Sequence, residues 1–392
     1  MRIVCLSSTF PTPSRFWRGA FVQNFCLALE AGGATVSAIV PEGWHACIKD
    51  RIQKTLLPKT LKQEQIRTTI AAYPSLSVLA ARHRILAEID RILCQRSIER
   101  QLDRMDPKPD LIYAHFVRGG LLVLDWCKTN KVRLAVISGE SSYQRFLSNE
   151  DSQELRTRIE EFDYLFFVSD RNQQELSNFV GAREPLGSVL GNAVSCEDFQ
   201  PLDKLACRKE LGLPQEAIIV IFTGYFIDRK GPMRVLQAIH SLPGVYGIFI
   251  GTGGSPPKGD QVLHAGPVEN SMVSKWLNAA DIFVLPSYQE GRSNAVLEAL
   301  ACGLPLVVSD RDFNREFLNE ECALFVEPGS VQSITSAVRR LAESPELRER
   351  MGKASREHAM KFSQRERAMR FLTEVGFDRA GMESSFERGR DI

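Results

Sequence analysis

Long apolar runs and a strong charge of one sign are both missing from this 392-residue sequence. No uninterrupted apolar stretch reaches about 18 residues, the length typical of a membrane-spanning helix. The apolar start, residues 1–6, is too short for the core of a signal peptide. The formal net charge of +1 gives no reason to expect a nucleic-acid partner. We therefore expect a cytoplasmic protein, either free or peripheral to the inner face of a membrane.

Cysteine spacing excludes further classes of protein. None of the nine cysteines forms a C-x-x-C pair, the spacing typical of zinc ribbons and thioredoxin-like redox sites. Most of them lie in apolar segments. Reduced, buried thiols in a cytosolic protein are the simplest interpretation.

What the sequence does contain is two series of short apolar segments that alternate with helical patterns. With 44% hydrophobic residues and no low-complexity tract, the chain is long enough for two ordinary domains. Such alternation is typical of doubly wound parallel sheets, which bind ligands outside the carboxyl ends of their strands. We predict an α/β fold with two Rossmann-like domains facing one another across a cleft, residues 1–198 and 199–364. The predicted strands are 3–7, 35–40, 111–114, 134–137, 164–168 and 188–190 in the first domain, and 218–222, 247–250, 262–265, 282–285 and 306–308 in the second.

Residues 44–105 interrupt this alternation, and we predict a long, basic, largely helical insertion there. Charge is unevenly distributed, because residues 1–149 carry 21 Lys or Arg against 12 Asp or Glu. Within the insertion, residues 45–70 interleave cations with apolar side chains. Such a segment is able to rest on an anionic membrane. A merely solvated helical face explains it equally well.

Residues 281–310 form the most informative stretch, a predicted strand, loop, helix and strand. Ser293 is a suitable N-cap, Gly303 suits the left-handed position after the helix, and Pro305 prevents continuation. The helix body is apolar almost all round, as expected for burial against a sheet. Glu298 breaks this pattern. A buried carboxylate needs hydrogen-bond donors, and a ligand rich in hydroxyls is one source of them.

Glu290 lies eight positions before Glu298, in the loop that leads into the helix. This loop presents backbone N–H groups at a positive helix end, where phosphate binds well. One carboxylate before this anion site and another on the second helical turn suit a ligand with both phosphate and sugar. The predicted phosphate-binding residues are Gly291, Arg292, Ser293 and Asn294.

The stretch from Glu290-Gly291 to Glu298-Ala299-Leu300-Ala301-Cys302-Gly303-Leu304-Pro305 resembles the E-x7-E signature of family-four retaining glycosyltransferases. This family has the two-domain GT-B fold. The resemblance implies a nucleotide-sugar donor, UDP- or GDP-linked, and hexosyl transfer with retention to a hydroxyl of a glycan, lipid-linked or small-molecule acceptor. It further implies that Glu298 holds the ribose, that Glu290 contacts sugar hydroxyls, and that residues 365–392 return to the first domain.

No cofactor and no divalent metal are expected if this resemblance holds. An acidic D-x-D motif does not follow a predicted strand in a suitable position. Asp310-Arg311-Asp312 has the letters of such a motif. It lies after the second strand of the 281–310 stretch, where a polar loop cluster is the favoured interpretation.

Residues 223–234 follow a strand and lead into a helix, and they carry two cations. Arg229 and Lys230 are able to neutralise a diphosphate and its leaving charge. The family pattern has Gly, then a small or basic residue, then Lys-Gly. Gly224 and Lys230-Gly231 match it, whereas Tyr225 departs and shifts the expected phosphate contacts to Arg229 and Lys230.

Glycines after the next strand resemble the family's Gly-x-Gly, where the backbone approaches the nucleotide. They are Gly251 and Gly253. The helix that usually follows is missing, because only residues 255–261 separate them from the next strand. Further on, a backbone contact to the donor is expected at Pro267 and Val268.

The first domain is expected to hold the acceptor. His115 ends a strand at the position of a family histidine that contacts the transferred sugar or the acceptor. Residues 138–141 stand where the family more often has His-Gly-x-Asp; Gly139 fits, Ser138 replaces the histidine, and Glu140 or Ser141 is a candidate sugar or acceptor contact. Near the N-terminus, a loop resembles one that lies close to the donor diphosphate, with candidate contacts at Arg18 and Gly19.

Three alternative interpretations stay open. The two glutamates could be a solvated loop residue and a helix residue paired with a cation, and the basic residues could be surface charges at helix ends. A nucleotide-sugar epimerase shares the two-domain architecture but lacks the E-x7-E spacing. A non-catalytic nucleotide-sugar-binding protein would keep the nucleotide site, but it could lose His115 and Lys230, which are both present.

Overall fold

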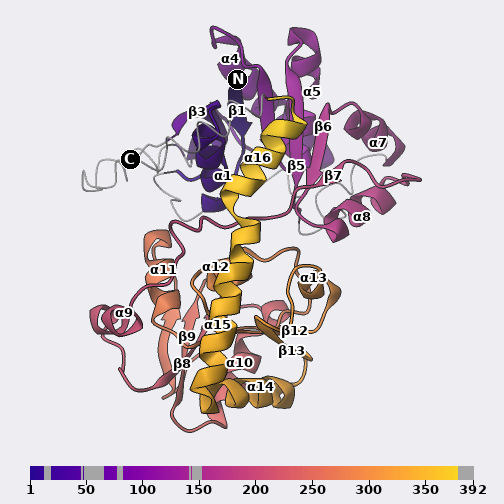
Figure 1. The fold of residues 1–392 in the computed structure, drawn as a ribbon. Coiled ribbons are helices and arrows are strands. Elements are labelled where there is room, and N and C mark those ends of the chain that lie inside the picture. The colour runs from indigo at the N-terminus through magenta and orange to yellow at the C-terminus, as the bar shows by residue number, and fades with distance from the viewer. Residues whose placement is uncertain are drawn as a thin grey trace. The chain divides into compact units, whose positions relative to one another are not determined.

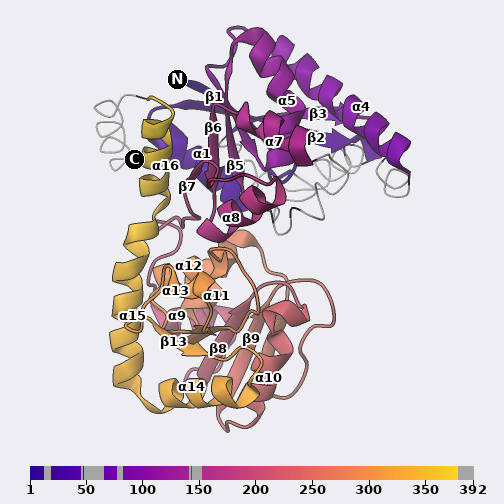
Figure 2. The same cartoon turned by 90° about the vertical axis from the view of Figure 1, so that its right-hand side faces the viewer.

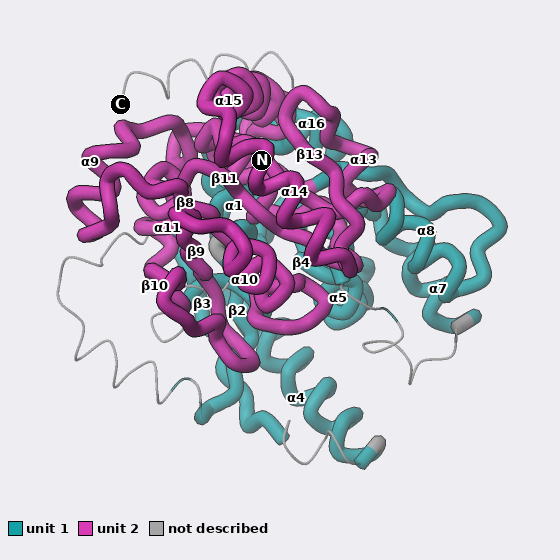
Figure 3. The backbone as a smooth tube through the Cα atoms, turned by 90° about the horizontal axis from the view of Figure 1, so that it is seen from below, with its two compact units in different colours: residues 1–191, 367–392 teal, residues 192–366 magenta. Residues whose placement is uncertain are grey.

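A computed structural model describes residues 1–12, 19–45, 47, 66–76, 83–140, 143 and 152–377. The chain forms two compact units, shown in different colours in Figure 3. Unit 1 comprises residues 1–191 and 367–392, and unit 2 comprises residues 192–366. The predicted α/β class with two parallel sheets is confirmed.

The sheet of unit 1 has seven strands in the order β3-β2-β1-β4-β5-β6-β7. The strand order reverses between β1 and β4, which is the switch point where ligands bind in such sheets. The strands are β1 Arg2–Leu6, β2 Thr35–Gly43, β3 Arg67–Tyr73, β4 Leu111–His115, β5 Arg133–Ser138, β6 Tyr164–Phe167 and β7 Ser188–Val189. The helices are α1 Ala20–Ala31, α4 Arg84–Asp103, α5 Val117–Asn130, α7 Ser152–Glu160, α8 Asp170–Phe179 and α16 Gln364–Glu374.

Both faces of this sheet are covered, which explains why its strands are apolar without alternation. Cys5 and Tyr113 face one layer of the core, which includes α1 and α16. Their neighbours Leu6 and Ala114 face the other layer, which includes α4, α5, α7 and α8. Figures 1 and 2 show these helices on opposite sides of the strands.

The sheet of unit 2 has six strands in the order β10-β9-β8-β11-β12-β13, so its switch point lies between β8 and β11. The strands are β8 Ile218–Thr223, β9 Val245–Ile250, β10 Val262–Gly266, β11 Ile282–Leu285, β12 Leu306–Ser309 and β13 Ala323–Val326. The helices are α9 Lys204–Leu211, α10 Pro232–His240, α11 Asn270–Asn278, α12 Asn294–Ala301, α13 Asp312–Arg315, α14 Val331–Glu343 and α15 Pro345–Ala359, with single 3-10 turns at η2 Asp228–Lys230 and η3 Met360–Phe362.

The prediction of a largely helical insertion over residues 44–105 is wrong for β3. This strand, Arg67–Tyr73, pairs in parallel with β2 from Ser37↔Arg67 to Gly43↔Tyr73. Its run Arg-Thr-Thr-Ile-Ala-Ala-Tyr contains Thr, Ile and Tyr, which favour strands, and this signal was overlooked within a segment read as helical. The short strand β13 is also absent from the predicted set. Most of the basic segment 45–70 lies outside the described residues.

Residues 192–198 group with unit 2, although we expected them in the first domain. Val194 forms a parallel bridge with Ser363. Its N–H donates to Phe362 O at 2.9 Å, and its carbonyl accepts from Gln364 N at 2.9 Å. These bonds tie together the two segments through which the chain enters and leaves unit 2, and they explain the boundary after Gly191.

A buried ion pair holds α9 against the start of the central strands of unit 2. Arg208 Nη2 lies 2.6 Å from Asp281 Oδ2, and both side chains are about 2% exposed. Asp281 Oδ2 also accepts from Ile219 N at 2.8 Å. Asp281, part of the predicted motif stretch, therefore has a structural role in joining β8, β11 and α9.

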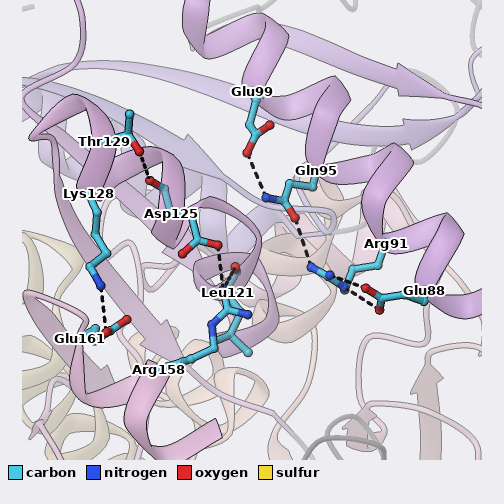
Figure 4. A network of polar contacts seen from close by, with 10 residues as sticks. All are labelled: Glu88, Arg91, Gln95, Glu99, Leu121, Asp125, Lys128, Thr129, Arg158 and Glu161. Atoms are coloured by element: carbon cyan, nitrogen blue, oxygen red, sulfur yellow. Dashed lines mark hydrogen bonds and ion pairs between the residues drawn. The ribbon is translucent and has the colours of Figure 1, made fainter. Parts of the chain in front are cut away.

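Polar contacts on the surface of unit 1 connect its outer helices, as Figure 4 shows. Lys128 Nζ of α5 lies 2.8 Å from Glu161 Oε1, and Arg158 of α7 lies 3.3 Å from Asp125 Oδ2. Exposed pairs of this kind contribute roughly 0–1 kcal/mol each. They orient the surface helices, whereas the apolar layers hold the unit together.

No helix within the described ranges combines the length and apolar character that crossing a membrane requires.

Candidate active site

Two loops flank the switch point of unit 2 and are hydrogen-bonded to each other. The first follows β8 and contains η2, and the second follows β11 and leads into α12. Tyr288 N of the second loop donates to Arg229 O of the first at 2.8 Å. The Arg229 guanidinium also donates to the carbonyl of Gln289.

The structure brings together three of the predicted catalytic residues at these loops. Lys230 Nζ lies 3.0 Å from Glu290 Oε1, and Arg229 Nη1 lies 3.2 Å from the same oxygen. The side chains of Lys230 and Glu290 are each about 12% exposed. In this partly desolvated position their charges interact more strongly than they would in water.

The N-terminus of α12 opens beside this cluster. Ser293 occupies the N-cap position with an extended backbone (φ −72°, ψ 122°), but its hydroxyl makes no capping hydrogen bond. The predicted N-cap position is confirmed, and without a side-chain cap the N–H groups of the first turn keep their capacity to bind an anion. The C-terminal end follows the prediction. Gly303 has φ +74°, and Leu304 N donates to Ala299 O at 3.0 Å, the Schellman pattern.

Several buried polar atoms near the carboxyl ends of β8 and β11 have no hydrogen-bond partner in the described part of the chain. They are Thr223 Oγ1, Ser287 Oγ and Asn294 Oδ1. Buried polar atoms are nearly always paired, so a group of unpaired ones indicates a polar ligand or water. The sequence analysis did not identify Thr223 and Ser287. The available signal was a hydroxyl residue at the end of buried strand β8 and another two residues after buried strand β11.

Glu298 lies on the second turn of α12, half-buried among apolar side chains. No described residue donates a hydrogen bond to its carboxylate or forms an ion pair with it. Although part of its surface is exposed, the surrounding protein atoms desolvate the carboxylate, and this burial raises the pKa of Glu298 to about 8. The alternative interpretation, in which a neighbouring cation pairs with the helix glutamate, is therefore wrong for Glu298 within the described part of the chain. Hydroxyl donors of a ligand would supply the missing bonds.

The side chain of Arg292 packs against two aromatic rings. Its guanidinium carbon lies 5.5 Å from the ring centre of Phe317 and 5.1 Å from that of Phe362. Its carbonyl accepts from Asn192 Nδ2 at 2.8 Å. These contacts anchor the loop that precedes α12, and the phosphate contact of Arg292 stays a prediction.

The predicted glycines bring two backbone segments into close contact. Gly224 N donates to Ile250 O at 2.9 Å, and a Cβ at Gly251 would lie 1.8 Å from Gly224 O. Gly253 has φ +90°, and a Cβ on it would lie 3.8 Å from the ring of Tyr225, a tyrosine that is 61% exposed. As expected, no helix occurs in residues 251–261. Val268 packs its side chain against the core of unit 2, so any donor contact there would use its backbone.

His115 ends β4 beside the switch point of unit 1, and its ring is buried. Its Nδ1 lies 2.5 Å from Tyr113 Oη, and the rings of Phe21 and Phe116 pack edge-on at 5.2 and 4.5 Å. Burial, reinforced by the Arg367 guanidinium, lowers the pKa of His115 to about 3. The imidazole is therefore neutral at physiological pH.

Glu140 is buried, and its carboxylate is engaged inside unit 1. Oε1 accepts from Val117 N at 2.7 Å, at the first turn of α5. Oε2 accepts from Ser138 Oγ at 2.6 Å and from Gly139 N at 3.0 Å. Despite these bonds, burial raises the pKa of Glu140. The geometry is that of a helix cap, and a contact to the acceptor would have to compete with it.

Of the remaining predicted residues of the first domain, Gly19 lies within the described part of the chain. Gly19 precedes α1 with φ +72°, and a Cβ there would lie 1.5 Å from Thr9 O, so only glycine fits. Arg18 and Ser141 lie outside the described residues.

The stretch from Asp310 to Asp312 in unit 2 forms ion pairs, Arg315 to Asp310 at 2.8 Å and Arg311 to Glu327 at 2.7 Å, as we expect of a polar loop cluster. Over the described ranges, no group of three His, Cys, Asp or Glu is arranged to hold a metal ion.

Comparison with known proteins shows which family this region resembles. The family model "Glycosyl transferases group 1" matches residues 203–358, which include both loops and α12. The Bacillus subtilis (strain 168) protein TuaC, named as a glycosyltransferase of teichuronic acid biosynthesis, is 27% identical over 87% of this chain and 89% of its own.

Solved structures share the fold of the whole chain. Sucrose-phosphate synthase from Thermosynechococcus elongatus matches with a TM-score of 0.72 at 19% identity, over 96% of this chain and 98% of its own. Anabaena Alr3699/HepE, solved in complex with UDP-glucose, matches with a TM-score of 0.69 at 16% identity, over 95% of this chain and 100% of its own. At these identities the likeness concerns the fold, and the predicted GT-B fold is confirmed.

The raised pKa of Glu298 predicts a pH-dependent effect of Glu298→Gln on stability. Because the folded-state pKa of about 8 lies above the ordinary value of 4.5, wild type loses stability as the pH rises between these values. Glutamine removes this loss. We expect the variant to exceed wild type by roughly 1–3 kcal/mol at pH 9, with a much smaller gap at pH 5, measured by urea unfolding. Glu346→Gln, at an exposed position of α15, is the control; an equal gap at both pH values contradicts the assignment.

The environment of His115 predicts a histidine that does not titrate in the working range. With its pKa lowered to about 3 by burial, the ring should keep one tautomer between pH 8 and pH 5. NMR of protein labelled with ¹⁵N-histidine measures this directly, and His115→Gln assigns the signal. If the ¹⁵N chemical shift of the ring reaches the imidazolium value by pH 5, His115 is protonated there, and the burial that lowers its pKa is contradicted.

Proposed function

We propose that this chain, whose residues 203–358 match the glycosyl transferase group 1 family model, transfers a hexosyl group from a UDP- or GDP-linked donor. Transfer retains the anomeric configuration, uses no divalent metal and ends on a hydroxyl of the acceptor. One observation carries this proposal: Lys230 and Arg229 meet Glu290 beside the uncapped N-terminus of the helix that bears Glu298.

The donor diphosphate binds at the N-terminus of α12, where the first-turn N–H groups and the fixed cations Arg229 and Lys230 oppose its charge. As the sugar–phosphate bond breaks, negative charge grows on the leaving diphosphate, and groups held in place beforehand stabilise it without reorganising. This preorganised positive charge is our reason for proposing transfer without a metal.

Glu298 accepts hydrogen bonds from the ribose hydroxyls and Glu290 from hydroxyls of the transferred sugar. The acceptor hydroxyl attacks the anomeric carbon from the face that the diphosphate leaves, and a phosphate oxygen of the donor takes its proton. The new glycosidic bond therefore has the configuration of the old one. The protein contributes positioning and electrostatics.

Unit 1 supplies the acceptor side. Neutral His115, at the switch point between β1 and β4, is able to hydrogen-bond an uncharged sugar or acceptor hydroxyl. Gly139 and Glu140 shape the adjoining strand end, and Arg18 and Gly19 belong to the loop assigned to the donor diphosphate. The likeness to TuaC over most of the chain supports a glycan acceptor, and a lipid-linked form is the variant that we favour.

The test of this function is a panel of UDP- and GDP-sugars, read by nucleotide release and by mass spectrometry of the product. We expect one donor class to be consumed, and Lys230→Met to lower kcat/KM for it by about 100- to 1,000-fold, the usual effect of losing one preorganised charge donor. Lys353→Met, an exposed position on α15, should leave activity unchanged. If wild type consumes no donor, the proposed function is refuted; if Lys230→Met matches wild type, the role of Lys230 at the diphosphate is refuted. An epimerised donor would point to isomerase chemistry.

The basic segment provides the proposed membrane contact for a lipid-linked acceptor. Its cations are Lys49, Arg51, Lys54, Lys59, Lys62 and Arg67, against Asp50 and Glu64. Each cation near an anionic surface contributes about 1 kcal/mol. We expect sedimentation with vesicles containing anionic lipid, release at 1 M salt, and loss of binding when Lys54, Lys59 and Lys62 become Gln. Equal behaviour with zwitterionic vesicles would exclude the contact.

A further inference from the structure

Arg234 is a buried cation in an unfavourable place. It is the third residue of α10, which begins at Pro232, and it is 8% exposed. The N-terminus of a helix is its positive end, so a cation in the first turn is destabilised by the helix dipole. Removing the guanidinium from water adds a further cost. Its position therefore requires specific partners, and none of the motifs that identify the family explains it.

The partners of Arg234 come from both loops of the site. Nη1 lies 2.6 Å from Asp228 Oδ1, and Nη2 donates to Asp228 O at 2.8 Å. Nη2 also donates to Pro286 O at 3.2 Å, and the guanidinium carbon lies 4.1 Å from the ring centre of Tyr288. Asp228 opens η2, whereas Pro286 and Tyr288 belong to the loop after β11. One planar group thus bonds the two loops at once.

Gly231 makes this arrangement possible. It has φ +77°, and a Cβ on it would lie 2.6 Å from Arg234 Nη2. The guanidinium therefore folds back over the glycine toward η2, into space that any other residue would occupy. In the Lys230-Gly231 pair, Lys230 therefore provides a cation, and Gly231 leaves space for the guanidinium of Arg234.

The two bonded segments carry the charged groups assigned to the donor. Arg229 and Lys230 directly follow Asp228 in η2, and Glu290 lies two residues after Tyr288. We infer that Arg234 is a positioning residue, which sets the distance between the η2 cations and Glu290 by clamping their two loops. This inference rests on the proposed function, because it assigns Arg234 a role in the same donor site. Tyr288 N bonded to Arg229 O forms the second link of the clamp.

The experiment compares Arg234→Met, which keeps the length but removes every donor, with Arg234→Lys. Displacing catalytic groups by about 1 Å costs on the order of 100-fold in rate. We expect Arg234→Met to lower kcat/KM for the donor by about 10- to 100-fold, with a raised KM, and Arg234→Lys to recover part of this loss. A fold defect alone would lower the active fraction and leave KM unchanged.

A double-mutant cycle with Lys230→Met separates positioning from general destabilisation. If Arg234 acts through Lys230, adding Arg234→Met to Lys230→Met should cost far less than it does in wild type, because coupled residues are non-additive. Full additivity would overturn the inference. Arg348→Met is the matched control, since Arg348 donates to two backbone carbonyls of α14, Leu341 and Ala342. It should lower the melting temperature without changing KM.

The outcomes distinguish this inference from the proposed function. If wild type consumes a nucleotide-sugar and both Arg234 variants have its KM and kcat, the clamp is refuted and the function stands. If wild type consumes none, the proposed function fails first. Should Arg234→Met not fold, Arg234→Lys decides: it keeps the charge but cannot make the planar contacts to both loops, and unchanged kinetics would refute the clamp.

Discussion

The attraction of two cations to the single carboxylate of Glu290 is the interaction on which the site depends. Lys230 and Arg229 reach the same oxygen only because β8 and β11, distant in sequence, are neighbours in the sheet. The order of strands reverses between them, and ligands bind at such switch points in parallel sheets. The partly buried position strengthens each charge interaction. A diphosphate that enters there meets cations whose places are already set.

Several groups in the same region are in energetically unfavourable environments. Ser293 leaves a helix end uncapped, Glu298 is desolvated without a protein donor, and Thr223 and Ser287 bury unpaired hydroxyls. Arg234 adds a cation at a positive helix end. Departures of this kind cluster at functional sites, because a group that a ligand will satisfy cannot also be satisfied by the fold. The polyhydroxylated, anionic donor that we propose would supply partners for these groups.

Much of the fold was predictable because buried parallel strands and helix ends have local signatures. Ile282–Leu285 and the end of α12 at Gly303 follow from an apolar run, a left-handed glycine and a following proline. β3 was missed, although its Thr, Ile and Tyr favour a strand, because the surrounding segment was read as helical; in the structure it pairs with β2. In the site, the E-x7-E spacing identified Glu290 and Glu298, and the Lys-Gly pair identified Lys230. Glu140 looked similar from the sequence, yet its carboxylate accepts from Val117 N at the first turn of α5 and from Ser138 and Gly139 beside it. No spacing rule indicates the bond to Val117, 23 residues away.

The sequence by itself determined which chemical groups are available and on which strand ends they lie, because strand periodicity and helix capping act over a few residues. Tertiary structure alone decided which of these groups meet. Glu290 is 60 residues from Lys230 in the chain and 3.0 Å from it in space, and Arg234 bridges to Pro286 across a similar separation. Burial is likewise a property of the packed chain. It gives Glu298 a pKa of about 8 and His115 a pKa of about 3, because desolvation depends on all surrounding atoms and not on neighbours in sequence.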